Sequence, residues 1–524
     1  MLLRTTSTGL RTAAPRRGGF VIVAVLLVIA VLTLAAYQYS TLMDAEFMAA
    51  ERIRKAGEAR VLADAGVHYA CAVLADPDAF TGKLNSNPFD NPSVFQSVVV
   101  KEADSPRAQG RFSLMAPDYA NVSQTGTIPT RFGVVDEAGK LNVNALYAAD
   151  SSGQVLHDAL MKLPNMTDEI AWCIVDWVDA NDEPSAGGAE TQYYASLTPP
   201  YKCKNAPLDT VEELLLVKGV TPALLYGTDK NRNGKTDPGE DDGLGFSAGW
   251  VAYLTVYSRE RNVDGEGNKR VNLNGNDLTT LQTDLTAVVG EDLTNFVIAY
   301  RLYGATSTTT SKGPPTPTTP GTSAQLKQLV EQAVKAVTAP KQRISSLFSL
   351  MDATVTVAST NRMRPSVAYK SPLKSAEPDA EMLGQLLDKC TTSANAELPA
   401  HVNVNTASRE VLMCLPGMTD ADADAIIAKR PTYYNGDAPD TNFNTIAWLI
   451  TAAGLKPTVL QSLERYVTAR TQVYRVISVG HFDEAGPIAR VEAVIDVNQG
   501  KPRIAYYRDL TDQGRVVDPR TAGQ

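Results

Sequence analysis

The sequence predicts an α+β protein in which one long N-terminal helix precedes short strands, helical modules and a final group of strands. Three observations support this class. An unbroken apolar run from Val21 to Ala36 continues into a helical pattern. Two similar segments in the middle of the chain each have the pattern of a helix pair. Strand-like runs bounded by glycine, proline and asparagine lie on both sides of these segments.

The composition is that of a large globular protein. Hydrophobic residues make up 44% of the 524 residues, enough for several domains with their own cores. The formal net charge of −9 and the lack of a long basic tract argue against a general nucleic-acid-binding protein. The four histidines form no metal-ligand or nucleophile motif, so the sequence predicts no catalytic site.

The apolar run is flanked by a strong charge asymmetry. Four arginines precede it, whereas the first acidic residue of the chain is Asp44. This asymmetry predicts a cytoplasmic N-terminus and places the residues beyond Ala36 outside the cytoplasm. The run of about 17 residues is near the lower limit for a helix that spans a bilayer.

Three alternatives explain such a segment. A secretory signal peptide would be cleaved near Thr33-Leu34-Ala35, and a plain membrane anchor would stay intact. The third alternative rests on Gly19 and Phe20, because a glycine directly before the apolar run and after basic residues resembles the leader of type IV prepilins. We favour this alternative, in which a peptidase cuts between Gly19 and Phe20 on the cytoplasmic side and leaves the apolar helix on the mature protein.

The helix is predicted to continue beyond the apolar run. Apolar residues recur at spacings of three and four from Phe47 to Val73, with charged residues between them. Pro77 ends the pattern. One helix over residues 20–78, apolar at one end and amphipathic at the other, is typical of pilins.

Ala24 departs from the usual pilin pattern. Most pilin-like proteins have glutamate at the fifth residue of the mature chain, where it is thought to pair with the N-terminal amine of the subunit above. Ala24 occupies that position here. A buried carboxylate without a partner is costly, and a subunit with nothing above it needs none. Ala24 therefore either weakens the resemblance or marks a subunit at the tip of a filament.

Short strands are predicted on either side of the central region. Arg111–Ala116 and Arg131–Asp136 have the composition of strands and are bounded by turn residues. Near the C-terminus, three runs of alternating polarity predict an antiparallel meander: Val473–Val479, Ala489–Asp496 and Arg503–Asp509.

A pattern of apolar residues and asparagines occurs three times, as Leu141-Asn-Val-Asn144, Val271-Asn-Leu-Asn274 and Val402-Asn-Val-Asn405. The first and last copies are followed by Leu-Pro-x-Met-Thr-Asp and a helical pattern, at Leu163 and Leu415. These segments predict two modules of helix-hairpin-helix or SAM-like type, in which the asparagines cap turns and open helices. Their turns lack the second glycine of DNA-binding hairpins and carry acidic residues, so a structural or protein-contact role is expected.

The region between the two modules contains a predicted linker. Residues 304–323 are rich in threonine, proline, glycine and serine and predict a flexible segment. Residues 324–338 then have the periodicity of a helix. The chain thus divides into a leader, the long helix, a first group of strands, the first module, an intervening region, the second module and the C-terminal strands, at residues 1–19, 20–78, 79–140, 141–258, 259–395, 396–470 and 471–524.

Residues 229–240 have the pattern of a calcium-binding loop. Side-chain oxygens fall at the first, third, fifth, ninth and twelfth positions, and Gly234 is the sixth residue. The alternative is a turn rich in asparagine and glycine with solvated charges. A phosphate-binding loop is rejected, because Gly227 is too far before Gly234 and no strand precedes it. The predicted ligands are Asp229, Asn231, Asn233, the backbone carbonyl of Lys235, Asp237 and Glu240.

A second acidic stretch follows the first module's helical pattern. Asp179, Asp182 and Glu190 lie around a pair of glycines and could bind a second calcium ion. A capped helix end with a polar loop explains the same residues equally well.

The five cysteines leave two alternatives open. They are too few for a disulfide scaffold, and none forms a CxxC pair. Outside the cytoplasm, Cys173–Cys203 and Cys390–Cys414 could form disulfides. Buried free thiols are the alternative.

One longer block, taken with the residues above, points to a family. It runs from Asp176-Trp-Val-Asp-Ala-Asn-Asp182 through Tyr193-Tyr194 to Val211-Glu-Glu-Leu214. Together with Asp136-Glu-Ala-Gly-Lys-Leu-Asn-Val-Asn144 and His401-Val-Asn-Val-Asn-Thr-Ala407, it resembles the type II secretion system minor pseudopilin K family, also called general secretion pathway protein K.

The resemblance implies a pilin-like body with a large helical domain inserted between its strands, and calcium bound by that domain. It implies an inner-membrane protein with one span, a cytoplasmic N-terminus and a large periplasmic domain at the tip of the pseudopilus. The expected partners are the minor pseudopilins I and J, the rest of the pseudopilus, the prepilin peptidase and the inner membrane, and not nucleic acid. The alternatives are a pilus-like minor pilin for DNA uptake or adhesion, and a membrane-anchored calcium-binding adhesin. Residues 304–323 depart from the family's usual pattern.

Overall fold

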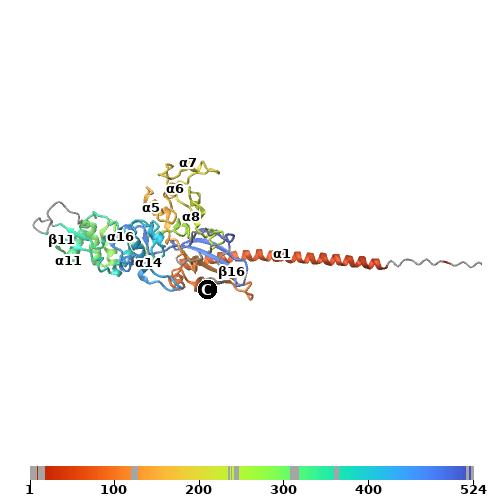
Figure 1. Cartoon of the computed structure of the whole chain (residues 1–524). Coiled ribbons are helices and arrows are strands. Elements are labelled where there is room, and N and C mark those ends of the chain that lie inside the picture. Colours follow the sequence, from red (N-terminus) through yellow and green to blue (C-terminus); the bar gives the residue numbers. More distant parts are fainter. Residues whose placement is uncertain are drawn as a thin grey trace, which may run out of the picture.

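The computed structural model describes residues 9, 18–119, 128–233, 237, 239–240, 247–306, 318–358, 365–484, 486–514 and 519–520. One long helix, α1 (Gly18–Ala75), projects from a body with several lobes (Figure 1). The lobe that carries α11 (Ser323–Lys335) and β11 (Ser366–Lys370) lies at the end of the body opposite to α1, and a separate lobe with α7 (Thr191–Tyr194) stands out to one side (Figure 1).

The two halves of α1 have different surroundings. The first half is exposed, and the helix contains an 18-residue window with a mean hydropathy of 3.0, enough to cross a membrane. The second half packs against the sheet through small and apolar side chains such as Ala63 and Val67. Asp76 then caps α2 (Pro77–Gly82), so the chain changes direction where Pro77 was predicted to end the helix. The predicted single long helix is confirmed.

Two glycines allow α1 to lie directly on the sheet. A Cβ atom at Gly480 would lie 2.0 Å from the carbonyl oxygen of Ala59, and one at Gly66 would lie 2.1 Å from Oγ of Ser478. Both distances are shorter than any van der Waals contact. Any larger residue at either position would therefore push the helix away from the sheet.

One antiparallel sheet is built from both ends of the chain. Its strands are β1 (Val98–Lys101), β2 (Gly110–Pro117), β3 (Thr130–Phe132), β4 (Val135–Asp136), β16 (Val473–Phe482), β17 (Ala489–Asp496) and β18 (Arg503–Asp509). The order is β1-β2-β16-β17-β18, with β3 beside β2 and β4 beside β16. In the pairing of β2 with β16, Phe482 lies opposite Gly110. The region between β4 and β16 is therefore an insertion into one sheet.

The predicted strands correspond closely to this sheet. Arg111–Ala116 lies within β2, and the three predicted C-terminal strands are β16, β17 and β18. The run predicted over Arg131–Asp136 is divided at Gly133 into β3 and β4. A Cβ atom at Gly133 would lie 2.2 Å from the carbonyl oxygen of Phe89, so the chain turns there beneath another backbone segment.

Two hydrophobic cores correspond to the body and the insertion. The first core joins α1 and α3 (Pro92–Phe95) to the sheet and includes Phe112 and Ile495. The second core joins the elements of the insertion, from Leu141 to Val467. Along the chain, the first core reaches Val134 and resumes at Tyr474, on either side of the insertion.

The insertion consists of short helices and two- to five-residue strands around the second core. In chain order they are β5 (Leu141–Asn142), α4 (Val143–Ala149), α5 (Gln154–Leu160), α6 (Asp168–Val178), α7, η2 (Val211–Leu216), α8 (Pro222–Tyr226), η3 (Trp250–Ala252), β6 (Leu254–Thr255), β7 (Glu260–Arg261), β8 (Val271–Asn272), α9 (Leu278–Val289), α10 (Glu291–Tyr303), β9 (Thr318–Pro320), α11, η4 (Leu347–Leu350), β10 (Thr354–Val357), β11, α12 (Ala380–Lys389), β12 (Cys390–Thr391), β13 (Glu397–Leu398), β14 (Val402–Asn403), α13 (Arg409–Met413), α14 (Asp420–Lys429), η5 (Thr441–Asn444), α15 (Trp448–Thr451), α16 (Pro457–Leu463) and β15 (Val467–Thr468).

The insertion repeats one unit three times. In each unit the first residues of an asparagine motif form a short strand, which pairs in parallel with a later dipeptide that ends in threonine: β5 with β6, β8 with β12, and β14 with β15. Each unit contains a pair of consecutive helices, namely α5 and α6, α9 and α10, or α13 and α14. The sequence motifs predict the first and last units but not the middle one, which lacks the Leu-Pro-x-Met-Thr-Asp segment.

The asparagines of the motifs have two roles. Asn142 caps α4 as predicted, because its side chain accepts a hydrogen bond from a backbone N–H of the first turn at 3.0 Å. The second asparagine of each motif instead bonds to a distant backbone segment of the same unit. Asn274, for example, accepts a hydrogen bond from the N–H of Ile344 at 2.9 Å. Asn144 and Asn405 make similar long-range bonds.

The predicted linker over residues 304–323 is ordered on both sides of residues 307–317, which lie outside the described part of the chain. The N–H of Thr306 donates to the carbonyl oxygen of Thr354 at 2.7 Å. Residues 318–320 form β9, which pairs in parallel with β11. The prediction of a flexible segment is therefore wrong for these residues, because backbone pairing orders them. The helix predicted over 324–338 is α11.

All five cysteines are buried free thiols. The thiol of Cys203 donates to the carbonyl oxygen of Asp176 at 3.6 Å, and that of Cys173 to the carbonyl oxygen of Gly187 at 3.8 Å. Of the two alternatives, the structure supports free thiols and not the disulfides Cys173–Cys203 and Cys390–Cys414.

Candidate metal centre

The end of α6 carries two acidic side chains into the core of the insertion. Thr167 starts this helix by accepting a hydrogen bond from the N–H of Ile170 at 3.3 Å. Asp176 and Asp179 are three residues apart, so they lie on the same side of the helix end. Their exposed fractions are 0% and 5%.

Glu190 completes a cluster of three carboxylates. It lies directly before α7 and is 3% exposed. One carboxylate oxygen from each of Asp176, Asp179 and Glu190 lies within 4.8 Å of the others. Within the described part of the chain, no lysine or arginine forms a salt bridge with these three residues. The cluster is therefore acidic, buried and without a protein counter-ion.

The cluster differs from the predicted ligand set by one residue. Asp179 and Glu190 come together as predicted, but Asp176 takes the place expected for Asp182. Asp182 lies in the exposed loop beyond α6, where its Oδ1 accepts a hydrogen bond from the N–H of Thr191 at 3.2 Å. The side chain of Asp182 thus stabilises the turn at the rim of the cluster.

Burial controls the protonation of the three carboxylates. It raises the pKa of Asp176 and of Asp179. Burial, with a further contribution from the neighbouring Asp179 and Asp176, raises the pKa of Glu190 to about 7. Among the described residues, neither buried oxygen of Glu190 has a hydrogen-bond partner. Three buried carboxylates cannot all be ionised without compensating positive charge, so the cluster must hold protons or a cation.

The donor atoms fit a hard cation. Carboxylate and amide oxygens are the ligands that Ca²⁺ prefers. Asn205 lies beside Asp182 at the edge of the cluster, and its buried Oδ1 has no hydrogen-bond partner among the described residues. Its amide group donates instead to the carbonyl oxygen of Asn181. Asp176 could have been found from its helical spacing to Asp179, whereas no sequence signal places Asn205 there.

The predicted calcium loop folds back on itself. Oδ1 of Asp229 and Oδ1 of Asn231 both accept hydrogen bonds from the N–H of Asn233, at 2.9 and 3.0 Å. At the other end, the carboxylate of Glu240 accepts hydrogen bonds from the N–H groups of Asn231 and Asp237, at 3.3 and 3.0 Å. The five predicted ligand residues that the structure describes thus surround one turn.

In this loop the amide groups of two predicted ligands point toward a carboxylate. The amide groups of Asn231 and Asn233 both donate to Oδ2 of Asp237 at 2.8 Å. A bound cation would require these amides to present oxygen, which a rotation of the side chain achieves. Lys235, whose backbone carbonyl is the remaining predicted ligand, lies outside the described residues, as does Gly234. The residues fit a calcium loop, and calcium binding here stays a prediction.

Two models of one family match the chain. Both describe the type II secretion system (T2SS), protein K, and they match residues 139–227 and residues 402–468. These ranges correspond to parts of the first and last of the three units. These two segments are therefore similar to the type II secretion system protein K family. The first matched range contains the cluster around Asp176, whereas the loop at 229–240 lies just beyond it.

Two similar proteins match limited parts of this chain. The chain is 35% identical over 82 residues to the type II secretion system protein K of Pectobacterium carotovorum subsp. carotovorum, which is 15% of this chain and 25% of that protein. A putative type II secretion system protein K of Escherichia coli (strain K12) is 35% identical over 85 residues, 16% of this chain and 26% of that protein. The chain thus spans about a quarter of the length of these relatives.

One solved structure matches a larger part of the chain, but its similarity to the chain is low. It is the crystal structure of the GspK-GspI-GspJ complex from the type 2 secretion system of enterotoxigenic Escherichia coli. The match has 10% sequence identity, covers 89% of this chain and 98% of that chain, and has a TM-score of 0.30.

Proposed function

We propose that this protein is a minor pseudopilin at the tip of the type II secretion pseudopilus, where it acts in assembly initiation and in protein export across the outer membrane. The observation that carries the proposal is one chain that combines two segments of the protein K family with a membrane-length helix lying on an antiparallel sheet. The proposal gives the protein a structural role and no catalytic one.

The shape of the molecule supports a place at the tip. The insertion extends beyond the end of α1 and also stands out to one side of its axis (Figure 1). Subunits along a fibre repeat closely around a common axis, so a copy of this insertion on every subunit would collide with its neighbours. One copy at the end of the fibre avoids this collision. Ala24 agrees with such a position, since a tip subunit has no amine above it to neutralise.

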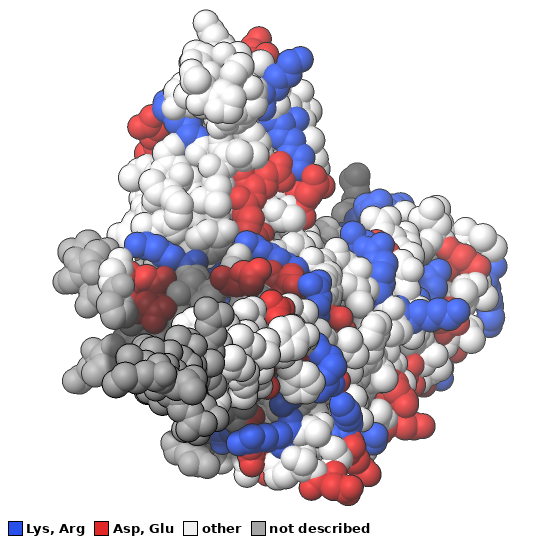
Figure 2. Space-filling model, turned by 90° about the vertical axis from the view of Figure 1, so that its right-hand side faces the viewer, with Lys and Arg blue, Asp and Glu red and all other residues white. Residues whose placement is uncertain are grey.

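The proposed partners are the minor pseudopilins I and J and the rest of the pseudopilus, in the inner membrane and periplasm. The surface supports protein partners, because acidic and basic side chains are interspersed over the face shown in Figure 2 and form no broad patch of one sign among its described residues. A phosphate backbone would favour a basic patch.

The partner proposal is tested by co-purification. We expect the full-length protein, extracted in detergent, to co-purify with homologues of pseudopilins I and J. A monodisperse monomer in their presence would contradict the proposal. A shift of double-stranded DNA at physiological salt would support a DNA-uptake pilin instead.

The membrane topology is tested by N-terminal sequencing of the mature protein. Cleavage by the prepilin peptidase would leave Phe20 as the first residue. An intact N-terminus would indicate a permanently anchored protein such as an adhesin, and cleavage after Ala35 would indicate a secretory signal peptide.

We further propose that the insertion binds calcium at the cluster of Asp176, Asp179 and Glu190 and at the loop 229–240. Isothermal titration of the full-length protein with calcium tests both sites. Glu190→Gln should remove the binding of calcium to the acidic cluster. Asp229→Ala should remove the binding of calcium to the loop 229–240. Absence of binding heat in the unmutated protein would refute the calcium proposal but would leave the secretion role open.

A further inference from the structure

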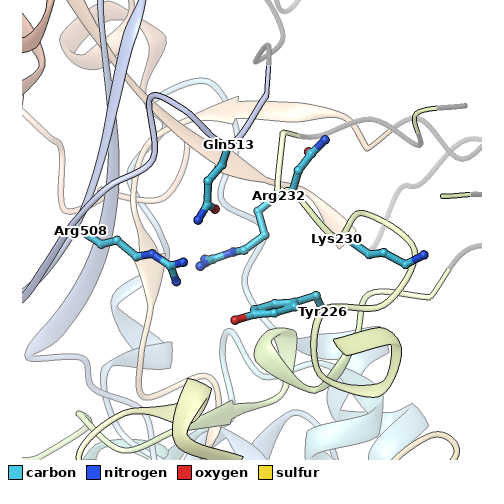
Figure 3. A pocket seen from close by; sticks show the side chains of 6 residues that line it. Tyr226, Lys230, Arg232, Arg508 and Gln513 are labelled. Carbon is cyan, nitrogen blue, oxygen red and sulfur yellow. The ribbon is translucent and has the colours of Figure 1, made fainter. Parts of the chain in front are cut away.

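A cavity of about 240 Å³ lies where residues 230–232 meet the end of β18 (Figure 3). Its walls come from the insertion on one side and from the C-terminal strand of the body on the other. Three of its described lining residues are cations, and none is acidic. These lining residues are Tyr226, Lys230, Asn231, Arg232, Arg508 and Gln513. The cavity is therefore lined by positive charge.

Two arginines face each other across the cavity. The guanidinium groups of Arg232 and Arg508 point toward one another, and the side chain of Gln513 reaches toward the same gap (Figure 3). The ring of Tyr226 lies on the opposite side of the gap from Gln513. Lys230 points away from the gap, so it adds positive charge only at a distance. Like charges that face each other repel, so this arrangement favours an anion between them.

The protein itself supplies one carboxylate to both guanidinium groups. An oxygen of Glu212 lies 3.8 Å from Arg232 and 3.6 Å from Arg508. A charge-assisted hydrogen bond has a donor–acceptor distance of about 2.7–2.9 Å. At these longer distances Glu212 offsets one positive charge but accepts a hydrogen bond from neither arginine. Within the described part of the chain, Arg508 forms no other salt bridge. Positive charge and hydrogen-bond donors thus remain in excess at the cavity.

An ion pair outside the cavity orients the Arg232 side chain. Both terminal nitrogens of Arg232 donate to the carboxylate of Glu492 on β17, one of them at 3.0 Å. Glu492 is fully buried and also accepts a hydrogen bond from Arg475 on β16 at 3.0 Å. A guanidinium group has five N–H donors, so three donors of Arg232 remain. The ion pair therefore fixes Arg232 and leaves it able to bind an anion.

The walls of the cavity are held together by close contacts with the backbone. Arg490 on β17 is 3% exposed, and its guanidinium donates to the carbonyl oxygens of Arg232 and, at 3.2 Å, of Asn231. Gly514 has a φ of +97°, and a Cβ atom there would lie 3.0 Å from Nδ2 of Asn231. A glycine at this position lets the turn that carries Gln513 approach the loop closely. The cavity therefore exists before a ligand binds, which lowers the cost of binding.

We propose that this cavity binds a phosphate-class oxyanion, either inorganic phosphate or the phosphoryl group of a larger molecule. Arginine is the side chain that best matches phosphate oxygens, because its N–H groups form a planar fork. The amide of Gln513 can donate to a further oxygen. The donors come from the loop, from β18 and from the turn after it, an arrangement that suits a tetrahedral anion better than a planar carboxylate. The inference goes beyond the proposed role in secretion and does not depend on calcium.

Isothermal titration with inorganic phosphate tests the site. The full-length protein is kept in an uncharged detergent, and the buffer contains no added calcium, phosphate or sulfate. We expect saturable binding of one phosphate per protein. No saturable binding at concentrations up to about 10 mM would overturn the proposal. A second titration with glycerol 3-phosphate distinguishes the two sources. Tighter binding than that of inorganic phosphate would assign the site to a phosphoryl group on a larger molecule, and weaker binding would assign it to the free ion.

Matched variants separate the cavity from general charge attraction. Arg508→Met should lower the affinity for phosphate at least tenfold, because it removes one of the two facing guanidinium groups. Arg503→Met is the control, since Arg503 is an exposed cation of the same strand that does not line the cavity. It should change the affinity less than about twofold, because an exposed charge outside the site is screened. Equal losses in the two variants, or unchanged affinity in Arg508→Met, would refute the site.

A neutral variant covers the case in which Arg508→Met does not fold. Gln513→Leu removes one donor at the turn after β18 and leaves every charge of the cavity in place. A hydrogen bond to a charged group is lost, so the affinity for phosphate should fall about tenfold. Unchanged affinity in Gln513→Leu would then refute the site.

Discussion

A Cβ atom at Gly188 would lie 1.8 Å from Oδ2 of Asp176, so only glycine leaves room for that carboxylate. Gly188→Ala should therefore force Asp176 out of the cluster with Asp179 and Glu190. We expect calcium affinity at this cluster to fall at least tenfold, that is by about 1.4 kcal/mol or more of binding free energy. Isothermal titration measures this change. Gly82→Ala is the control, since a Cβ atom there meets no atom within 4 Å. Unchanged affinity in Gly188→Ala would exclude Asp176 as a ligand.

The buried ion pairs of Arg475 with Glu137 and Glu492 predict that the protein loses stability in acid. Burial opposes the ionisation of Glu137, but Arg475 and Lys140 outweigh it and lower its pKa from 4.5 to about 2. Between these values the folded protein binds fewer protons than the unfolded chain. The stabilisation is therefore complete above about pH 4.5 and is lost as the pH falls toward about 2. The pKa of Glu492 is lowered as well and acts in the same direction.

Denaturant unfolding at a series of pH values measures this effect. Each carboxylate should contribute on the order of 3 kcal/mol to the fall in unfolding free energy between pH 5 and pH 2. Glu137→Gln should lose its share of the pH dependence and be less stable at pH 7, because Arg475 keeps a buried charge with one fewer partner. Glu484→Gln alters an exposed ion pair with Arg107 and should change little. An unaltered acid dependence in Glu137→Gln would contradict the prediction.

The middle unit should depend on its asparagine. The side chain of Asn274 accepts a hydrogen bond from the N–H of Ile344 and donates to the carbonyl oxygens of Ile344 and Thr392, all at 2.9 Å. Asn274→Ala removes these bonds and leaves buried backbone groups unpaired, which should destabilise the unit by about 2–3 kcal/mol. Hydrogen exchange in α9 and α10 reports the change. Asn276→Ala, at an exposed position of the same turn, is the control. Equal stability of the two variants would show that the asparagine does not hold the unit.

The free thiols predict a simple chemical result. Alkylation in denaturant without a reductant should modify all five cysteines. In the folded protein the reaction should be slow, since all five side chains are buried. Intact-mass spectrometry counts the modified residues. A mass that lacks two alkyl groups would reveal a disulfide.

Local patterns predicted the parts of the fold that depend on nearby residues. α1 and strands β16 to β18 follow from periodicity and turn residues, and both persist in the structure. The pairing of β2 with β16 could not be predicted, because the two strands are far apart in the chain and carry no local mark of their partner. For the same reason, the composition of residues 318–320 suggested flexibility, whereas their order comes from pairing with β11.

The repeats show how one physical role can be filled by different residues. In the first and last units the turn before the second helix uses Asn165 and Gly417, with φ values of +58° and +79°. The middle unit uses Gly290, with a φ of +80°, but no Leu-Pro-x-Met-Thr-Asp surrounds it. The Leu-Pro-x-Met-Thr-Asp segment marks only two units, whereas the strand pairing and the backbone conformation identify three.

The acidic cluster of Asp176, Asp179 and Glu190 shows a related difference. The predicted set took acidic residues from one loop, because they are near each other in the chain. In the structure, the cluster contains Asp176 and not Asp182. One turn of helix places Asp176 beside Asp179, and both side chains are buried. The addition of Asn205 depends on the path of a later segment, which the sequence does not encode in any short motif.

The middle unit is connected to the rest of the protein through two strands that lie side by side. β7 and β13 pair antiparallel, with Arg261 opposite Glu397, so the entry and exit of the unit lie side by side. A chain that enters and leaves at one point can gain or lose a whole unit there without a change in the distance between the segments that flank it. The segment between β7 and β13 can therefore be lengthened in evolution. A reporter domain can be inserted at the same position.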